Sequence, residues 1–238
     1  MTVSPRWLSN ASRPRTGPGP AANGPPVTIR SISGATGRFG TQHSATGESW
    51  FIQLPGLRVV TASSAGSAYA LLRAAIADPN PVLFFEHKGL YARKGPVRRG
   101  EVAEIGKAAI VRPGSDVTIV ATLLMVERAL AAADQLAADG IEAEVIDLRW
   151  LRPLDLPAVR ASVDRTGRLI VVEEQVHAAG WGATVVSELT IGGVRWASTP
   201  RRLSLPDDLP IPYTPTLEDE VLPSVEGGVA AARASVGR

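Results

Sequence analysis

The sequence predicts an α/β fold in which a parallel sheet is covered by helices on both faces. Short runs of continuous apolar residues alternate with segments of helical periodicity, which is the pattern of strands buried on both sides. Hydrophobic residues make up 45% of a 238-residue chain, enough to bury a sizeable core. The alternation is clearest in the second half, where we expect a three-layer domain over residues 107–238.

The composition of residues 1–26 predicts little regular structure at the start of the chain. Residues 1–26 are dense in Pro, Gly, Ser and Arg and show no hydrophobic period, so we expect a disordered leader. A β-branched strand at 27–30 then runs into a turn marked by regularly spaced glycines at 34–40. This arrangement predicts a strand that feeds a loop.

A strand, helix, strand crossover unit follows. The buried strands are expected at 57–61 and 81–86, with a helix at 67–77 between them. We therefore predict an α/β domain over residues 27–92. Residues 93–106 mix charges with glycine and proline, and we interpret them as the interdomain linker.

The elements of the second domain can be placed from periodicity and capping residues. A strand at 116–121 precedes a helix whose apolar face is formed by Leu123, Val126, Leu130, Ala133 and Ala137. Gly140 suits the left-handed position that ends this helix. Asp155 can cap a second helix that has Pro157 in its first turn and Gly167 beyond its end. The remaining elements are strands at 144–148, 169–173 and 201–205 and a helix at 180–189.

Composition excludes several classes of function. The net charge is +2 and the basic residues are dispersed, so no nucleic-acid surface is indicated. Cysteine is absent, which excludes disulfides, thiolate metal sites and a cysteine nucleophile and is compatible with a reducing compartment. No apolar run is long enough to cross a bilayer, and we expect a soluble cytoplasmic protein.

Few residues carry chemistry by pattern alone. His43, His87 and His177 show no chelating spacing, so a zinc site is not expected. His43 follows the end of a predicted strand, where ligand-facing groups lie in parallel sheets, but a solvated loop histidine is the alternative. His87 is expected at a surface or an interface. Glu173 and Glu174 are expected to point to opposite sides of their strand.

Other familiar site patterns are missing. The glycine turn at 34–40 lacks the P-loop lysine and the full dinucleotide fingerprint, so a tight loop is the better interpretation. The sequence contains no Gly-x-Ser-x-Gly elbow of a hydrolase. These residues alone therefore indicate an α/β protein whose ligand is unknown.

A series of segments in fixed order extends this interpretation. They include Gln42-His43-Ser44 and Glu86-His87-Lys88-Gly89-Leu90-Tyr91, together with 26–30, 54–60, 74–82, 114–120, 140–149, 166–169 and 217–219. This order resembles the β subunits of the thiamine-diphosphate-dependent decarboxylating component of pyruvate, branched-chain 2-oxo-acid and acetoin dehydrogenase complexes. The His87-Lys88 run looks closest to the pyruvate and acetoin types.

The resemblance implies a fold, partners and cofactors. The C-terminal domain would be transketolase-like, preceded by an incomplete pyrimidine-binding domain. An α subunit would complete a heterotetramer with β–β contacts and would hold thiamine diphosphate and magnesium at the interface. After decarboxylation the acyl group would pass to the lipoyl arm of an acyltransferase core, with the cofactor performing the difficult step.

Site residues also follow from the resemblance. His43 matches the histidine of the active-site channel and is the one catalytic residue expected, as a proton shuttle or a guide for the lipoyl group. No cofactor-binding residue is assigned. A potassium-type site of helix-terminal carbonyls would involve Val27, Ala75, Ile76, Asp78 and Asn80, although an ordinary helix C-terminus is the alternative.

One departure from the family pattern matters for activity. Nothing before Val27 resembles the long segment whose glutamate bonds the aminopyrimidine ring, so we expect an N-terminally truncated subunit whose sheet has an exposed edge. A truncated gene, a frameshift and a split subunit are all compatible with this. The chain alone is expected to be inactive. The alternative function is a non-catalytic relic or subunit-assembly module that retains the C-terminal domain.

Overall fold

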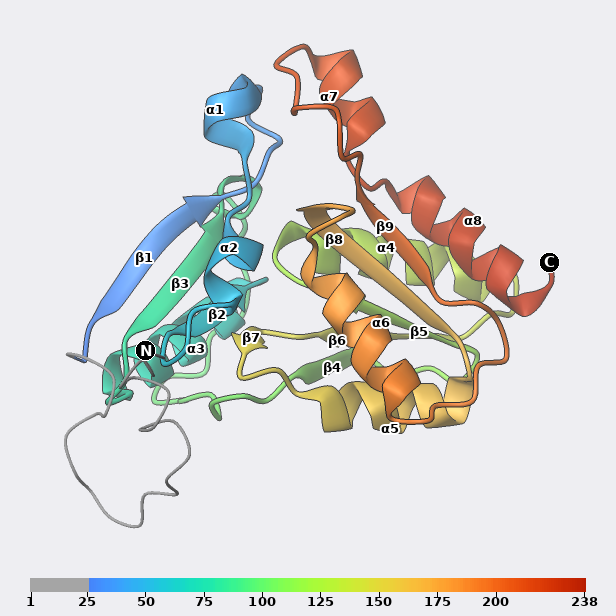
Figure 1. Cartoon of the computed structure of the whole chain (residues 1–238), viewed down its shortest axis with the longest axis horizontal. Coiled ribbons are helices and arrows are strands. Elements are labelled where there is room, and N and C mark those ends of the chain that lie inside the picture. The colour runs from blue at the N-terminus through green and yellow to red at the C-terminus, as the bar shows by residue number, and fades with distance from the viewer. Residues whose placement is uncertain (1–25) are drawn as a thin grey trace, which may run out of the picture.

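The computed structural model describes residues 26–238, which form two sheets lying side by side (Figure 1). Except for Pro26, the predicted disordered leader lies outside the described residues. Residues 91–108, which include the predicted linker, contain neither helix nor strand and connect the two sheets. No helix in residues 26–238 combines the length and apolar character needed to cross a membrane.

The N-terminal sheet has the strand order β1-β3-β2-β7. The crossover predicted from the sequence is present as β2 (Arg58–Ala62), α3 (Ala65–Ala77) and β3 (Val82–His87), and β3 is parallel to both β2 and β1 (Thr28–Ser33). The Ser64 hydroxyl caps α3 by accepting a hydrogen bond from the backbone N–H of Ser67. The Ser67 hydroxyl in turn accepts one from the backbone N–H of Ser64. β1 is the edge strand, and Ile29 and Ile32 are more than half exposed on it.

The fourth strand of this sheet comes from the second half of the chain. β7 (Trp150–Arg152) pairs antiparallel with β2, with Trp150 opposite Val60. The Trp150 side chain is fully buried and packs in the cluster that contains Val60 and Phe84. The segment therefore adds a strand to the first sheet, although its position in sequence suggests the second domain.

The C-terminal sheet has the strand order β4-β6-β5-β8-β9, and all its pairs are parallel except β4 with β6. Its strands are β4 (Ala109–Arg112), β5 (Val117–Ala121), β6 (Ala143–Asp147), β8 (Leu169–Val176) and β9 (Arg201–Leu205). α4 (Leu124–Ala138) and α8 (Val225–Val236) cover one face, while α5 (Leu156–Thr166) and α6 (Trp181–Ile191) cover the other. The predicted three-layer α/β domain is confirmed.

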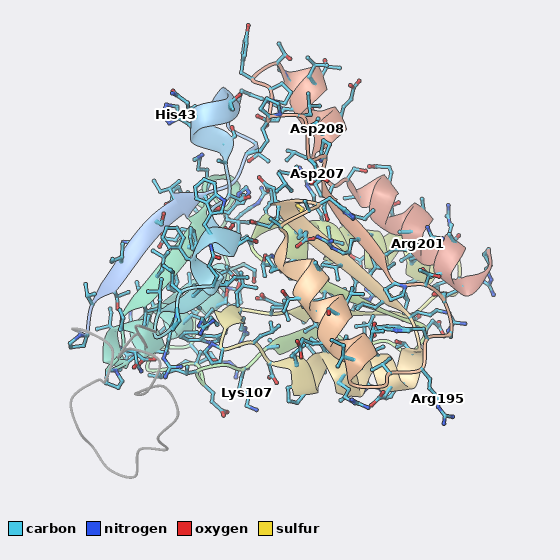
Figure 2. The ribbon with its side chains drawn as sticks, viewed as in Figure 1. His43, Lys107, Arg195, Arg201, Asp207 and Asp208 are labelled. Carbon is cyan, nitrogen blue, oxygen red and sulfur yellow. The ribbon has the colours of Figure 1, made fainter. Side chains whose placement is uncertain are left out.

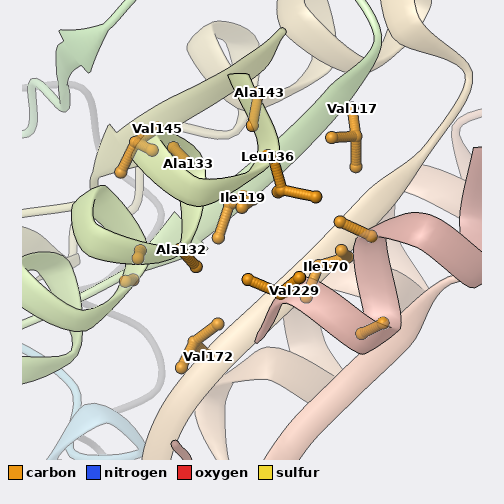
Figure 3. Packing of buried hydrophobic residues seen from close by; sticks show 14 of the residues in the cluster. Val117, Ile119, Ala132, Ala133, Leu136, Ala143, Val145, Ile170, Val172 and Val229 are labelled. Atoms are coloured by element: carbon orange, nitrogen blue, oxygen red, sulfur yellow. The ribbon is translucent and has the colours of Figure 1, made fainter. Parts of the chain in front are cut away.

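Alternate residues of the central strands serve the two helical layers. Ile119, Val145 and Ile170 pack toward α4 and α8, as Figure 3 shows. Their neighbours Val120, Ile146 and Val171 pack toward α5 and α6 in the second cluster. This is the two-sided burial that continuous apolar runs predict for a parallel sheet.

The predicted helix caps are also present. Asp155 accepts the backbone N–H of Ala158 at 3.3 Å, and Gly167 ends the same helix in the left-handed conformation at φ 64°. Gly140 follows α4 at φ 71°. Several elements were not predicted. Most are short: α1 (Gly40–Ser44), α2 (Glu48–Ile52), a 3₁₀ turn (Lys88–Leu90), α7 (Pro215–Val221), β4 and β7; the other is the 12-residue helix α8.

Candidate functional site

The predicted catalytic histidine lies on a segment at the contact between the two domains. We call residues 34–46 the His43 segment; it follows β1 and contains α1. Its first half is shaped by four residues in left-handed conformations, at Gly34, Thr36, Arg38 and Gly40. Two of these are not glycine, and such residues adopt this conformation at a cost unless the surroundings hold them there.

Glu174 on β8 contacts both ends of the His43 segment. Its Oε1 accepts the backbone N–H of Ala35 at 2.5 Å, while its backbone carbonyl accepts the hydroxyl of Thr46. Its Oε2 lies 2.9 Å from Nε2 of His87, at the end of β3. One buried residue of the C-terminal domain therefore holds the start and the end of the segment and the neighbouring strand.

His87 is a buried link between the domains, so of the two positions expected, a surface or an interface, the structure supports the interface. Its side chain is 1% exposed, because the His43 segment and β8 cover the end of β3. The backbone N–H of Gly89 donates to Nδ1 at 3.0 Å, so the ring proton of the neutral imidazole must be on Nε2, from which it is donated to Glu174. A methyl group at Gly34 would lie 2.0 Å from Nε2 of this ring, so the contact requires glycine there.

A second buried carboxylate lies beside the segment. Glu48 of α2 accepts the hydroxyl of Ser33 at 2.6 Å and the side-chain amide of Gln175. Burial raises the pKa of Glu48, while the two hydrogen bonds oppose the rise. Gln175 follows Glu174 on β8, so consecutive residues of one strand hold two parts of the N-terminal domain.

Lys88 closes the segment from the opposite side. Its Nζ donates to the carbonyl of Gly34 at 3.0 Å and to the carbonyl of His43, and it lies 5.5 Å from the ring centroid of Phe39. Burial lowers the pKa of Lys88, and the negative charges of Glu174 and Glu218 oppose this. The ammonium group therefore joins the two halves of the segment through their backbone.

Arg38 ties the segment to α7. Its guanidinium donates to Glu218 at 2.9 Å, to both oxygens of Asp219 at 3.0 and 3.2 Å, and to the carbonyl of Pro215 at 3.1 Å. The hydrogen bond from Arg38 lowers the pKa of Asp219. α1 and α7 consequently project together beyond the two sheets (Figure 1).

His43 itself is exposed on α1, at the end of the molecule that α1 and α7 form (Figure 2). An apolar cavity of about 170 Å³ lies near the base of its helix, between the domains. Its walls include Thr41, Trp50, Gln175 and Ile211. The histidine is thus presented outward on a backbone that buried groups hold from below.

The residues proposed for a cation lie at the other end of the N-terminal sheet. The carbonyl of Ala75 accepts from the Thr28 hydroxyl at 3.0 Å and the Asp78 N–H at 3.3 Å. Asp78 accepts from the backbone and side chain of Asn80 at 2.8 and 2.7 Å, and its second oxygen lies 2.5 Å from Nε of Arg58. Val27 accepts from Val82 beside them, while the Ile76 side chain is 67% exposed.

These groups are close together, and the carbonyls of Val27 and Ala75 and the carboxylate of Asp78 already have protein partners. The Arg58 guanidinium offsets the charge of Asp78, so a cation would share that carboxylate with it. In residues 26–238 no three His, Cys, Asp or Glu side chains gather in a way that could hold a metal ion. Carbonyl oxygens would therefore have to supply most ligands of any ion bound here.

Glu173 and Glu174 point to opposite faces of β8, as predicted. Glu173 is fully buried and accepts from Arg202 at 2.5 Å, Ser204 at 2.8 Å and the Gly182 N–H at 2.7 Å. Neither Glu48 nor Glu174 was predicted to belong to the site. The available signal for Glu174 was a run of acidic and amide side chains within an otherwise apolar strand, which is unusual because such groups are seldom buried without partners.

The chain was compared with known proteins. The family model described as transketolase, C-terminal domain, matches residues 106–227, and the one described as transketolase, pyrimidine binding domain, matches residues 21–94. The split gene transketolase, inactive beta4 tetramer, superimposes with a TM-score of 0.73 at 24% identity, covering 88% of this chain and 66% of that one. That likeness supports the fold.

Relatives in sequence are more similar. The β subunit of acetoin:2,6-dichlorophenolindophenol oxidoreductase from Cupriavidus necator is 43% identical over 87% of this chain and 62% of its own length. The pyruvate dehydrogenase E1 component subunit beta of Rhizobium meliloti is 40% identical over 89% of this chain and 46% of its own length. The mitochondrial subunit beta-2 of the same component from Oryza sativa is 41% identical over 87% of this chain and 57% of its own length.

The chain thus spans between 46% and 62% of the length of these relatives. The two family models together cover the strands of both sheets, the His43 segment and the residues of the contact between the domains. The chain therefore belongs to the transketolase C-terminal domain family and carries, ahead of that domain, a pyrimidine-binding domain of the transketolase type.

Proposed function

We propose that this chain acts as the β subunit of a thiamine-diphosphate-dependent enzyme that oxidatively decarboxylates pyruvate or a related 2-oxo acid and passes the acyl group to lipoyl. The observation that carries the proposal is 40–43% identity, over 87–89% of this chain, to β subunits of an acetoin oxidoreductase and of the pyruvate dehydrogenase E1 component. The geometry adds support, because an exposed histidine stands on a segment that buried charged groups fix in place.

The partners we propose are an α subunit of the same enzyme, a second β subunit and a lipoyl-bearing acyltransferase core. The relatives are named as β subunits, which supports a partner of a different kind. The projection formed by α1 and α7 carries His43 and would be the place where a lipoyl group approaches (Figure 2). The cytoplasm is the compartment we propose, since the chain has no cysteine that an oxidising compartment would use.

The proposed cofactors are thiamine diphosphate and magnesium, with the diphosphate and the metal held by the α subunit. The pyrimidine ring would require a carboxylate from the β side. Glu48, Glu174 and Glu218 are buried carboxylates beside the His43 segment. Both oxygens of Glu48 and Glu174 already accept bonds from within the chain, and Glu218 is paired with the Arg38 guanidinium. They do not fit that requirement, so we assign no step of cofactor chemistry to the described residues.

The step that this chain can supply is proton transfer at His43. When the lipoyl disulfide accepts the acyl group, one sulfur forms the thioester and the other leaves as a thiolate that takes a proton. An exposed imidazole on a fixed backbone can donate that proton, and such a group typically contributes about 10²–10⁴-fold in rate. The solvated-histidine alternative predicts no such contribution.

We also propose that a potassium ion binds at the end of α3. Its ligands would be backbone carbonyls of Val27, Ala75 and Ile76 with oxygens of Asp78 and Asn80. The support is that hydrogen bonds join three of these residues, Ala75, Asp78 and Asn80, at one end of the sheet. A thermal midpoint that rises with potassium chloride but not with choline chloride would support binding, and Asp78→Asn should abolish the difference.

The alternative function is a non-catalytic assembly module. The observation in its favour is that the chain spans 46% to 62% of the length of its relatives. The deciding experiment mixes the purified chain with the α subunit of the Cupriavidus necator enzyme, the part of its β subunit that this chain does not cover, thiamine diphosphate and magnesium, and follows reduction of 2,6-dichlorophenolindophenol with pyruvate or acetoin. Turnover supports the enzyme subunit, whereas a stable complex without turnover supports the assembly module.

A further inference from the structure

Glu174 makes three contacts that converge on the position of His43. Its carboxylate accepts a hydrogen bond from the N–H of Ala35 at the start of the His43 segment, and its backbone carbonyl accepts one from the hydroxyl of Thr46 at the end. Ala35 and Glu174 are 139 residues apart, so the contact forms only when the two domains are in place. Both ends of the segment are thereby fixed to one residue of β8.

The third contact of Glu174 fixes the residue that precedes Lys88. The second carboxylate oxygen of Glu174 accepts the proton on Nε2 of His87, which fixes the end of β3. The next residue is Lys88, whose ammonium group donates to the carbonyls of Gly34 and of His43. The backbone of His43 is therefore held through a short path that begins at Glu174.

We propose that Glu174 is a positioning residue for His43: by bracketing residues 34–46 and orienting His87, it sets the direction in which the His43 imidazole is presented to a lipoyl substrate. This rests on the proposed role of His43. Glu174 does not touch a substrate, and it acts through the backbone of the segment. The C-terminal domain thus takes part in positioning the proposed catalytic side chain of the N-terminal domain.

Another tie to the C-terminal domain runs from Arg38 to α7. The Arg38 side chain is 37% exposed and its partner Asp219 is 61% exposed, so water and salt weaken that pair, whereas its other partner Glu218 is buried. This tie reaches one point of the segment, whereas Glu174, which is 5% exposed, contacts both of its ends. Glu174 therefore constrains the backbone path at two points and Arg38 at one.

Glu174→Gln is an informative change because it preserves the shape of the side chain but replaces one of its two hydrogen-bond acceptors by a donor. The two carboxylate oxygens face two donors, the Ala35 N–H and the His87 Nε2–H. A glutamine has one amide oxygen and one NH₂ group, so either orientation of the amide sets a donor against a donor. His87 cannot relieve this by moving its proton, since Nδ1 already accepts from Gly89.

Glu173 offers a matched control. It precedes Glu174 on the same strand, is at least as deeply buried and also accepts a backbone N–H, from Gly182. Its contacts are with α6 and β9, on the opposite face of the sheet. Glu173→Gln should therefore perturb the C-terminal domain without reaching the His43 segment.

The test measures amide hydrogen exchange over residues 34–46 and the ring resonances of His43 in the full chain. We expect Glu174→Gln to speed exchange in this segment by about 10-fold or more, a coupling of the size typical between linked groups, and to move the His43 resonances. Glu173→Gln should leave both unchanged. Unchanged exchange in Glu174→Gln, or an equal change in both variants, would overturn the proposal.

Two further measurements test the role of Glu174 separately from the proposed catalytic role of His43. If Glu174→Gln does not fold, Thr46→Val removes only the bond at the end of the segment and should speed exchange over residues 41–46; no change there would also overturn the proposal. In the reconstituted enzyme, Glu174→Gln should lower kcat for lipoyl acylation with little effect on the KM for the 2-oxo acid. Failure of the proposed function would appear as unchanged turnover in His43→Ala, whereas the exchange result requires no activity.

Discussion

Glu173 and Glu174 are consecutive residues of β8 whose carboxylates lie in different parts of the molecule. The first is buried in the C-terminal domain against Arg202, and the second is buried in the contact between the domains against His87. A strand turns successive side chains to opposite faces, so one short sequence stabilises a domain and also joins it to its neighbour.

The Arg202–Glu173 pair gives a prediction for stability. Arg202→Met leaves the Glu173 charge buried with only Ser204 and a backbone N–H as partners, so the free energy of unfolding should fall by about 3–5 kcal/mol. Urea unfolding measures the loss. Arg160→Met is the control, because its pair with Asp164 is exposed and should contribute less than about 1 kcal/mol. Equal losses would contradict the prediction.

The contact of Gly34 with His87 predicts a second stability effect. Gly34→Ala must place a methyl group 2.0 Å from the imidazole at φ +86°, so the loss combines left-handed strain with overpacking and should reach about 2–5 kcal/mol. Gly140→Ala shares the left-handed conformation, at φ +71°, but meets nothing within 4 Å. It should cost about 1–2 kcal/mol in the same unfolding experiment. The prediction fails if Gly34→Ala and Gly140→Ala lower the free energy of unfolding by the same amount.

The pKa of Glu48 predicts how stability depends on pH. The unfolded chain ionises this group near its ordinary pKa of 4.5, whereas burial raises the pKa in the folded protein. Between the two values the folded protein binds more protons, so the contribution of Glu48 to the free energy of unfolding falls as the pH rises from 4.5 and levels off above the folded pKa. Glu48→Gln does not titrate, so the stability of the wild type minus that of the variant should decrease over this interval. A constant or rising difference would rule this out.

His43→Ala tests the proposed catalytic role. In the enzyme reconstituted with an α subunit and the part of a β subunit that this chain does not cover, acyl transfer to lipoyl should fall by about 10²–10⁴-fold, while binding of thiamine diphosphate changes little. Single-turnover kinetics measure the first quantity and calorimetry the second. His177→Ala removes another exposed histidine, outside the His43 segment, and should retain full activity. Unchanged lipoyl-dependent turnover in His43→Ala would establish the solvated-histidine alternative.

Long apolar runs and capping residues could be read from the sequence because they act locally. The strands of the C-terminal sheet other than β4 and the caps at Asp155 and Gly167 were predicted for this reason. α1 and α2 are five-residue helices, too short to show a period. β7 follows β6 closely, and the left-handed turn at Arg149, with φ 57°, redirects the chain to the other sheet, which periodicity does not reveal.

The candidate site was predictable only in part for a related reason. His43 was found from its place after a strand and from a family motif. Its supports, Glu48 and Glu174, are defined by partners more than 100 residues away in the other domain, at separations of 127 and 139 residues. No local pattern encodes such pairs, so the buried carboxylates became visible only in the folded chain.

The path of β7 has a consequence for protein engineering. A chimera that joins the first domain of one relative to the second domain of another within residues 93–106 would carry β2 from one parent and the β7 that completes its sheet from the other. Trp150 would then have to fit a foreign surface around Val60 and Phe84. Exchange between relatives should therefore succeed only when residues 150–152 are inherited together with the N-terminal sheet, as an insert within the second domain.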